Sequence, residues 1–215
     1  MKDMTIKQLS LPLLAAAFTL LFTGCSDDTT GPGEIEAQLE VHTVKDLPAD
    51  TDATPGSVSA NFTFYNLRDN SIVADEDSAS TQWDLAFSGT TILTNSGVSG
   101  PGEGGAVVLD QSFKATTMAP SEGLSVDTDS LLAIPTGRGN GWYNYDMEAH
   151  VVRPISDKTI VIRTADGEHY AKLKILNYYK GNPDMTSQEF QNDPPPSRYY
   201  TFEYAIQMDG SRDLN

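Results

Sequence analysis

The chain has 215 residues, of which 39% are hydrophobic, and a formal net charge of −16. Such an acidic protein repels nucleic acids and anionic lipid head groups, so the charge argues against nucleic-acid binding. Cys25 is the only cysteine, so the fold has no internal disulfide and must depend on its own core.

The first 24 residues have the features of a secretory signal peptide. Lys2 and Lys7 precede an apolar run over residues 9–22, which is shorter than the roughly 20 residues that a membrane-spanning helix needs. The run ends at Gly24-Cys25, a pair that resembles a bacterial lipobox. We therefore predict a leader over residues 1–24 and lipidation of the cysteine; the alternative is an ordinary thiol that merely follows a signal.

Residues 25–34 form a small, polar and acidic stretch. They bury too little apolar area to fold, so we expect a flexible tether. The serine and two aspartates directly after Cys25 resemble the surface-export signal of some Gram-negative lipoproteins, although a plain solvated linker fits as well. We expect a lipid anchor in the outer membrane, on the cell surface rather than the periplasmic face.

Removal of the leader, which contains two lysines and one aspartate, changes the formal charge from −16 to −17. The remaining residues 35–215 suffice for one domain of ordinary size.

Alternating apolar and polar residues predict strands in this domain. Residues 61–65 and 82–87 alternate with period two, which is typical of half-buried strands. Residues 159–163 are β-branched and predict a strand buried on both faces. Asp166-Gly167 follows, and this pair favours the positive φ angles of a tight hairpin turn.

Two further strands are predicted towards the C-terminus, each with one apolar and one polar face. Their apolar faces consist of Ala171, Leu173 and Ile175, and of Tyr200, Phe202, Tyr204 and Ile206. Together with residues 159–163 they predict a meander, interrupted by a loop over residues 180–197. Pro194–Pro196 should keep that loop extended and out of any sheet.

Helical periodicity is weak along the whole chain, and only residues 112–119 suit a turn or two of helix. Gly, Pro, Asn and Asp recur between the apolar runs, as expected where short strands need tight turns. The sequence predicts an all-β fold with minor helix, as a single domain of many short antiparallel strands.

Catalytic groups are scarce. The chain has three histidines, and no serine lies in the strand-turn-helix elbow of a hydrolase, so we expect no enzyme. The glycine-rich stretch 97–105 lacks the Lys-Ser/Thr ending of a phosphate-binding loop, and we expect its glycines to permit turns or close chain approach. The acidic stretches 75–77 and 127–129 lack the spacing of a calcium loop, and we expect them in solvated turns.

The segment 139–150 has aromatic residues at alternate positions, followed by Met147 and His150. Aromatic rings can stack on a flat apolar cofactor such as haem, and a thioether or imidazole can bind its iron. The alternative is a core strand that ends near a methionine and a histidine. Spacing alone favours the core strand.

Five motifs occur in the order found in the HmuY family of haem-binding outer-membrane lipoproteins, which the chain resembles over residues 60–208. They are the strand Trp83–Phe87, the glycine-rich loop 95–106, the approach Thr136–Trp142, the hairpin from Val161 to Lys172 with its Arg-x-Ala-Asp-Gly core, and the closing strand Tyr200–Tyr204. The predicted lipidation agrees with this resemblance.

The resemblance implies an all-β lipoprotein that takes haem from haemoproteins without catalysis and passes it to a TonB-dependent outer-membrane receptor. It also implies that the iron is held between two side chains on loops, either histidines or methionines. One of these ligands follows the Trp of the Gly-Trp motif by five residues. From Trp142 that position is Met147, with His150 as the competing candidate.

The second ligand of histidine-type members lies in a long insertion before the Gly-Trp motif. Here residues 128–141 contain neither His nor Met, and Met118, the nearest upstream thioether, is the candidate ligand for the opposite face of the haem. Tyr143 and Tyr145, beside Trp142, are expected to line the pocket rather than bind iron. The short stretch also leaves an alternative open, namely a surface or periplasmic interaction or adhesion module that does not bind haem.

Overall fold

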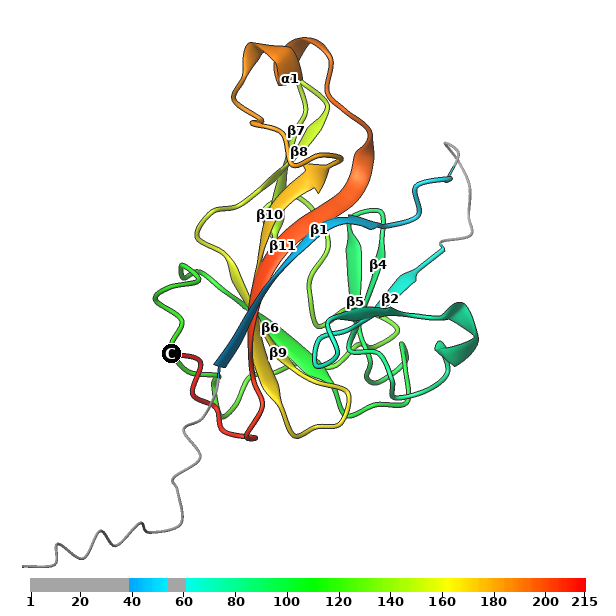
Figure 1. The fold of residues 1–215 in the computed structure, drawn as a ribbon, viewed down its shortest axis with the longest axis vertical. Helices are drawn as coiled ribbons and strands as arrows, with labels where there is room; N and C mark the ends of the chain where they lie inside the picture. The colour runs from blue at the N-terminus through cyan, green and yellow to red at the C-terminus, as the bar shows by residue number, and fades with distance from the viewer. Residues whose placement is uncertain (1–38, 54–60) are drawn as a thin grey trace, which may run out of the picture. The chain divides into compact units, whose positions relative to one another are not determined.

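The computed structural model describes residues 39–53 and 61–215. In these residues the chain folds into three antiparallel sheets (Figure 1). The predicted leader, Cys25 and the tether lie outside these residues. The described residues belong to one compact unit, and none of their helices is long and apolar enough to cross a membrane. The predicted all-β class with minor helix is confirmed.

The largest sheet has five strands in the order β1-β11-β10-β9-β6. Its strands are β1 (Leu39–Pro48), β6 (Gly105–Leu109), β9 (Thr159–Arg163), β10 (Tyr170–Tyr179) and β11 (Ser197–Gln207). Strands β9, β10 and β11 are antiparallel neighbours, so the predicted meander is confirmed. Pro194–Pro196 lie outside the sheet, directly before β11.

The turn between β9 and β10 is longer than the predicted tight turn. Arg163 pairs with Tyr170, which leaves residues 164–169 in the loop. Only Gly167 of the Asp-Gly pair has a positive φ, at 77°. Asp166 instead uses its carboxylate, whose Oδ1 accepts hydrogen bonds from the Thr164 hydroxyl and the Glu168 N–H at 2.6 and 3.0 Å.

The second sheet has the order β3-β2-β4-β5. Its strands are β2 (Thr63–Asn66), β3 (Ser71–Val73), β4 (Leu85–Ser88) and β5 (Thr91–Thr94), and the 3-10 turn η1 (Asp75–Asp77) follows β3. The strands predicted over residues 61–65 and 82–87 correspond to β2 and β4. Strand β4 begins only at Leu85, and the buried Asp84 carboxylate just before it accepts backbone N–H groups of Leu67 and Ala165.

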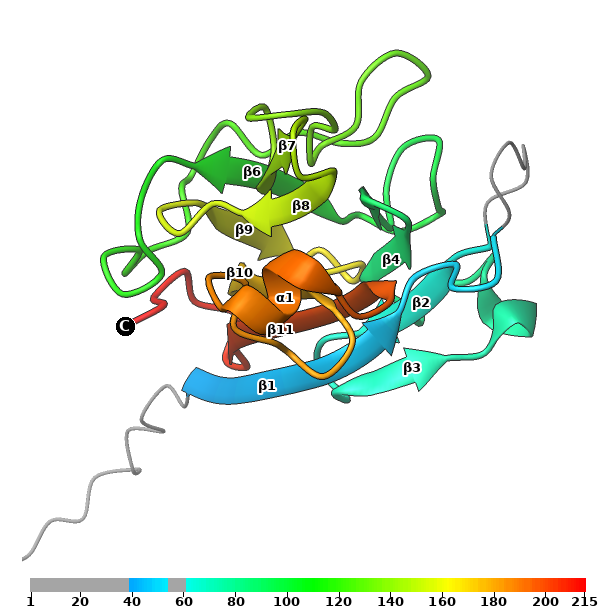
Figure 2. The same cartoon turned by 90° about the horizontal axis from the view of Figure 1, so that it is seen from above.

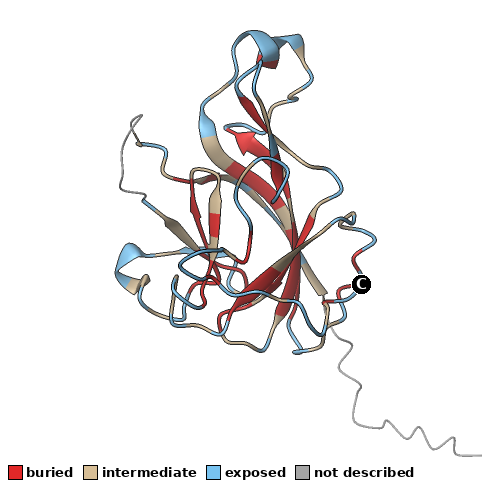
Figure 3. Cartoon of the chain, turned by 180° about the vertical axis from the view of Figure 1, so that it is seen from behind, coloured by how far each residue is buried: buried red, intermediate tan, exposed pale blue. Residues whose placement is uncertain are grey.

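The main core lies between these two sheets (Figure 3). The apolar face predicted for the last strand is completely buried, and its Phe202 stacks on Phe87 of β4 with ring centroids 5.5 Å apart. Tyr200 packs on the same ring at 5.0 Å. Aromatic pairs of this kind add to the stabilisation that burial alone supplies.

The opposite face of β10 and β11, expected to be polar, is also largely covered. Ala119 and Leu214 form a second apolar cluster there. Lys172 is buried, and its Nζ donates to the carbonyl of Thr116 at 2.8 Å. Lys172 and Lys174 both lie over the ring of Phe113. Their alkyl chains allow lysines to occupy a covered face while their ammonium groups remain paired.

A separate hairpin consists of β7 (Tyr143–Asp146) and β8 (Val151–Pro154). Beside it lies α1 (Gln188–Asn192), in the long loop before β11 (Figures 1 and 2). Residues 112–119, where a turn or two was expected, form one hydrogen-bonded turn from Ser112 and no helix. The helix α1 was missed because five residues show no periodicity; it begins after Ser187, whose hydroxyl accepts the Phe190 N–H.

Replacing Asp84 by asparagine should destabilise the fold. The Asp84 carboxylate accepts the Leu67 N–H on Oδ2 and the Ala165 N–H on Oδ1, each at 2.8 Å. The asparagine side chain would turn an NH₂ group towards one of these donors, which costs about 1–3 kcal/mol for a buried unsatisfied group. Urea unfolding measures this loss. The exposed Asp69→Asn should change stability by less than about 0.5 kcal/mol, and an equal effect of both variants would contradict the assignment.

Asp166 should make the fold sensitive to acid. Burial raises the pKa of this carboxyl. Hydrogen bonds from Thr164, Glu168 and His169 and the charge of Arg68 lower the pKa by more than burial raises it, so the net pKa is far below its usual range. A carboxyl with a lowered folded-state pKa stabilises the fold above its unfolded pKa near 3.9, and this contribution is lost as the pH falls.

The urea midpoint should therefore fall between pH 5 and pH 3, and less steeply in Asp166→Asn. The exposed Asp157→Asn controls for the change in net charge. Equal slopes in the wild type and Asp166→Asn would show that this carboxylate contributes nothing.

Candidate functional site

The β7–β8 hairpin presents most of the residues that the sequence singled out. Trp142, directly before β7, is buried in the core, where its ring lies 4.8 Å from Tyr143 and 5.2 Å from Tyr200. Its indole N–H donates to the Thr90 carbonyl at 3.2 Å. Tyr143 is buried as well, whereas Tyr145 packs at the edge of the core. Trp142 thus anchors the hairpin and is not exposed to solvent.

The turn at residues 147–150 exposes a thioether and an imidazole. Asp146 holds this turn, because its Oδ1 accepts the N–H groups of Glu148 and Ala149 at 3.0 and 3.1 Å. These two bonds lower the pKa of the Asp146 carboxyl. Met147 is left 62% exposed. His150 has a φ of 55°, and its Nδ1 lies 3.0 Å from the Tyr145 hydroxyl, so Nε2 is the nitrogen that could bind a metal.

Two arginines lie beside this turn in an otherwise acidic chain. Arg153 on β8 donates from Nη1 to the Met185 carbonyl at 2.9 Å, and its Nε lies 3.9 Å from Asp146 Oδ2. Its guanidinium lies 5.9 Å from the Phe190 ring centroid. The charge of Arg138 also acts on Asp146 and lowers its pKa. Guanidinium groups bind carboxylates well, so this end of the domain can receive an anionic group.

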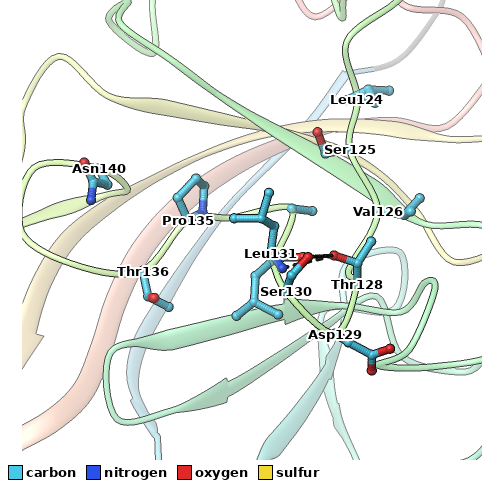
Figure 4. Close-up of a pocket in the computed structure, with 12 residues that line it drawn as sticks. Leu124, Ser125, Val126, Thr128, Asp129, Ser130, Leu131, Pro135, Thr136 and Asn140 are labelled. Carbon is cyan, nitrogen blue, oxygen red and sulfur yellow. Dashed lines mark hydrogen bonds between the residues drawn. The ribbon is translucent and has the colours of Figure 1, made fainter.

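A groove of about 880 Å³ lies along residues 124–140 (Figure 4). One side consists of Leu124, Ser125, Val126 and Thr128, and the other of Pro135, Thr136 and Asn140. The Thr128 hydroxyl fixes the turn between them, since it donates to the Leu131 carbonyl at 2.9 Å and accepts the Leu131 N–H at 3.0 Å. The volume is in the range of small-molecule and cofactor sites.

Asp127 fixes the groove segment to the rest of the domain. Its carboxylate accepts the Thr94 N–H on Oδ2 at 2.9 Å and the Ala133 N–H on Oδ1 at 2.7 Å. Asp127 is therefore buried, and the expectation of a solvated turn at residues 127–129 is wrong for this residue. Two buried N–H donors require an acceptor here, a need that sequence spacing does not reveal.

The groove lining contains apolar side chains and oxygen donors. Among the described residues, none of the predicted site residues lines it: Met118, Trp142, Tyr143, Tyr145, Met147 and His150. Leu131 and Val126 are 74% and 43% exposed. The groove adjoins the hairpin, since Gly139 N–H donates to the Tyr143 carbonyl at 2.8 Å.

Met118 lies apart from the hairpin. It is 64% exposed and pairs with Asp213 in an isolated β-bridge. The C-terminal segment and the β7–β8 hairpin lie at different ends of the domain in Figure 1. The structure therefore brings Met147, His150 and Tyr145 together but leaves Met118 elsewhere.

Sequence reasoning missed two residues at the hairpin end, Arg153 and Met185. The loop over residues 180–196 carries Met185 to the hairpin, and this polar loop has no periodicity that could place it. No group of three or more His, Cys, Asp or Glu side chains within residues 39–53 and 61–215 is arranged to hold a metal ion.

Comparisons with known proteins identify one family. The family described as HmuY protein matches residues 59–192. Among solved structures, the chain is similar to the crystal structure of the apo HmuY analog (TFO) of Tannerella forsythia, with 15% sequence identity and a TM-score of 0.49. That likeness covers 81% of this chain and 98% of the other. No match was found among curated proteins.

Proposed function

The chain belongs to the HmuY family, and from this premise we propose that it binds haem without catalysing a reaction. The observation that carries the proposal is Met147. It stands five residues after Trp142, is 62% exposed, and lies on a turn held by the Asp146 carboxylate. Haem is here a cargo that the protein captures.

The residues at the hairpin end fit such a cargo. A methionine thioether is a soft ligand that suits haem iron. Tyr145, two residues before Met147 in the chain, offers a partly buried ring, and Arg153 and Arg138 offer positive charge for the carboxylates of the porphyrin. The groove along residues 124–140 has no His or Met in its lining, so it offers no thioether or imidazole to the haem iron.

We propose further that the protein is exported, lipidated at Cys25 and anchored in the outer membrane. The basic start, the apolar run and the Gly-Cys junction support this address, and the acidic tether supports the cell surface over the periplasmic face. The HmuY resemblance supports transfer of haem to a TonB-dependent receptor.

A second candidate function is an interaction or adhesion module that does not bind haem. The groove favours it, because Leu131 and Val126 expose apolar area there, and exposed apolar patches often mark protein interfaces. A receptor recovered from solubilised outer membranes in the absence of haem would support this candidate.

Haemin should bind saturably to the mature chain, residues 25–215, carrying Cys25→Ser so that the thiol cannot bind iron. Titration should give a shifted Soret band with low-spin features, because a side chain replaces water on the iron. A broad spectrum like that of free haemin at every ratio would refute haem binding and leave the interaction module as the better candidate.

Met147→Ala should abolish the low-spin ferrous spectrum and weaken ferrous haem binding about tenfold or more, that is by about 1.4 kcal/mol. The matched variant His150→Ala should retain both. A thioether has no proton to gain on mild acidification, so haem binding through methionine should persist. Haem binding through an imidazole should weaken as the pH falls through about 6.5. The opposite result for the two variants would assign His150 as the ligand.

A further inference from the structure

The turn between β9 and β10 holds a histidine in one orientation. His169 Nδ1 lies 2.8 Å from Asp166 Oδ2, and Arg68 Nη1 donates to the same oxygen at 2.6 Å. Burial raises the pKa of Asp166, but its hydrogen bonds and the charge of Arg68 lower the pKa by more. The carboxylate is therefore ionised and can only accept hydrogen bonds. Nδ1 of a neutral His169 then carries the hydrogen, and Nε2 keeps its lone pair for another ligand.

The register of the large sheet places a methionine opposite this histidine. The β10–β11 ladder pairs Ala171 with Ile206, and both are buried in the main core. His169 and Met208 each lie two residues further along their own chain, so the register continues to them on the same face of the ladder. Opposite residues of an antiparallel pair have Cβ atoms about 4.5–5.5 Å apart. An imidazole and a thioether are thus neighbours across the end of these two strands.

Both side chains line one open pocket of about 520 Å³. The other residues of its lining belong to the end of β2, the turn after it and the loop before β4. Met208 is 36% exposed and the His169 side chain 19% exposed. A small ligand can therefore reach both groups from solvent.

The charges at this pocket suit a cation. Arg68 contributes a positive charge to the lining, but its guanidinium lies 2.6 Å from Asp166 Oδ2 and 3.9 Å from Asp84 Oδ1. Asp69 adds another carboxylate to the lining. These carboxylates balance the charge of Arg68, and the net charge of −16 attracts cations to the chain as a whole.

The two free donor atoms are those that copper prefers. Thioethers select Cu(I), and imidazole nitrogen also suits copper, whereas Ca²⁺ needs oxygen ligands. A metal-binding histidine usually donates its other ring N–H to a carboxylate, which fixes the ring. His169 has this partner in Asp166. Cu(I) is a closed-shell ion that accepts low coordination numbers, so a pair of neutral ligands can hold it.

From this arrangement we propose that His169 Nε2 and the sulfur of Met208 bind one Cu(I) ion. The site is separate from Met147, and the inference does not rest on the proposed haem binding. Asp166 acts as the positioning residue, since it fixes the ring through Nδ1 and leaves Nε2 to the metal.

The test measures the Cu(I) affinity of residues 25–215 carrying Cys25→Ser, so that the thiol cannot bind copper. Cu(I) is kept reduced by ascorbate under nitrogen, and the chelator bicinchoninate competes for it. The wild-type sequence with this one change should take up a single equivalent saturably. Absence of saturable uptake overturns the inference.

Four variants of this chain locate the site. Met208→Leu keeps an apolar side chain of similar size but removes the sulfur, and His169→Gln removes the imidazole. Each should weaken Cu(I) binding about tenfold or more. The matched variants Met118→Leu and His150→Gln should bind as the parent chain does. Far-UV circular dichroism and urea unfolding check that every variant is folded. Equal Cu(I) affinity of Met208→Leu and Met118→Leu contradicts the assignment.

Nuclear magnetic resonance with Ag(I), a redox-inert substitute for Cu(I), gives a readout on the unsubstituted site. With ¹³C-methyl methionine and ¹⁵N-histidine, one equivalent of Ag(I) should shift the Met208 methyl and the His169 Nε2 resonances and leave the Met118 methyl in place. First shifts at Met147 and His150 would instead locate the ion on the β7–β8 turn and overturn the inference.

Haemin titration of Met208→Leu separates this inference from the proposed function. Its Soret band should match that of the parent chain, because Met208 lies outside the hairpin. A parent chain that binds Cu(I) but no haemin refutes the proposed function and leaves the copper site standing. Loss of haemin binding in Met208→Leu would show that the pocket serves haem and would overturn the copper assignment.

Discussion

The arrangement of the sheets depends on a buried carboxylate, that of Asp84. It accepts one N–H from Leu67, just after β2, and another from Ala165, in the β9–β10 turn, so it joins the small sheet to the large one. Burial raises the pKa of this carboxyl, while the two backbone bonds and Arg68 oppose the rise. Asp127 acts in the same way between β5 and the groove segment. A domain without disulfides is thus cross-linked by carboxylates that satisfy backbone donors.

The glycine-rich loop is a consequence of this cross-linking. A Cβ on Gly97 would overlap the Asp127 carbonyl, and one on Gly102 would lie 2.7 Å from the Asn95 carbonyl and 2.9 Å from that of Ala165. The loop passes directly between the segments that the carboxylates join. The motifs on which the family resemblance depends, Trp-Asp, the glycine-rich loop and Arg-x-Ala-Asp-Gly, therefore specify the fold. The candidate ligand Met147 lies elsewhere, on a turn whose aspartate bonds only its own neighbours in the chain.

The separation between the motifs that specify the fold and the turn that carries the candidate ligand explains which features the sequence could predict. Strands β10 and β11 were predictable because apolar residues alternate with polar ones along them, and β9 because it is a short β-branched run. The length of the β9–β10 turn, the burial of Asp127 and the helix α1 were not, because each depends on side-chain to backbone bonds or on packing with distant residues. At the candidate site, Met147 followed from its offset to Trp142. The contact between Arg153 on β8 and Met185 in the loop before β11 needed the three-dimensional structure, since nothing in that loop's sequence relates it to the hairpin.

The proposed ligand Met147 lies on a turn and not in a strand of the core. Ligands fixed in β10 or β11 could leave iron only if the sheet distorted, at the cost of buried aromatic contacts such as Phe202 on Phe87. Met147 lies on a turn that Asp146 holds by hydrogen bonds at the surface, and such local structure opens far more cheaply than the core. The groove adjoins the hairpin through the bond from Gly139 to Tyr143. A partner that docks on the groove would therefore contact the segment next to this turn.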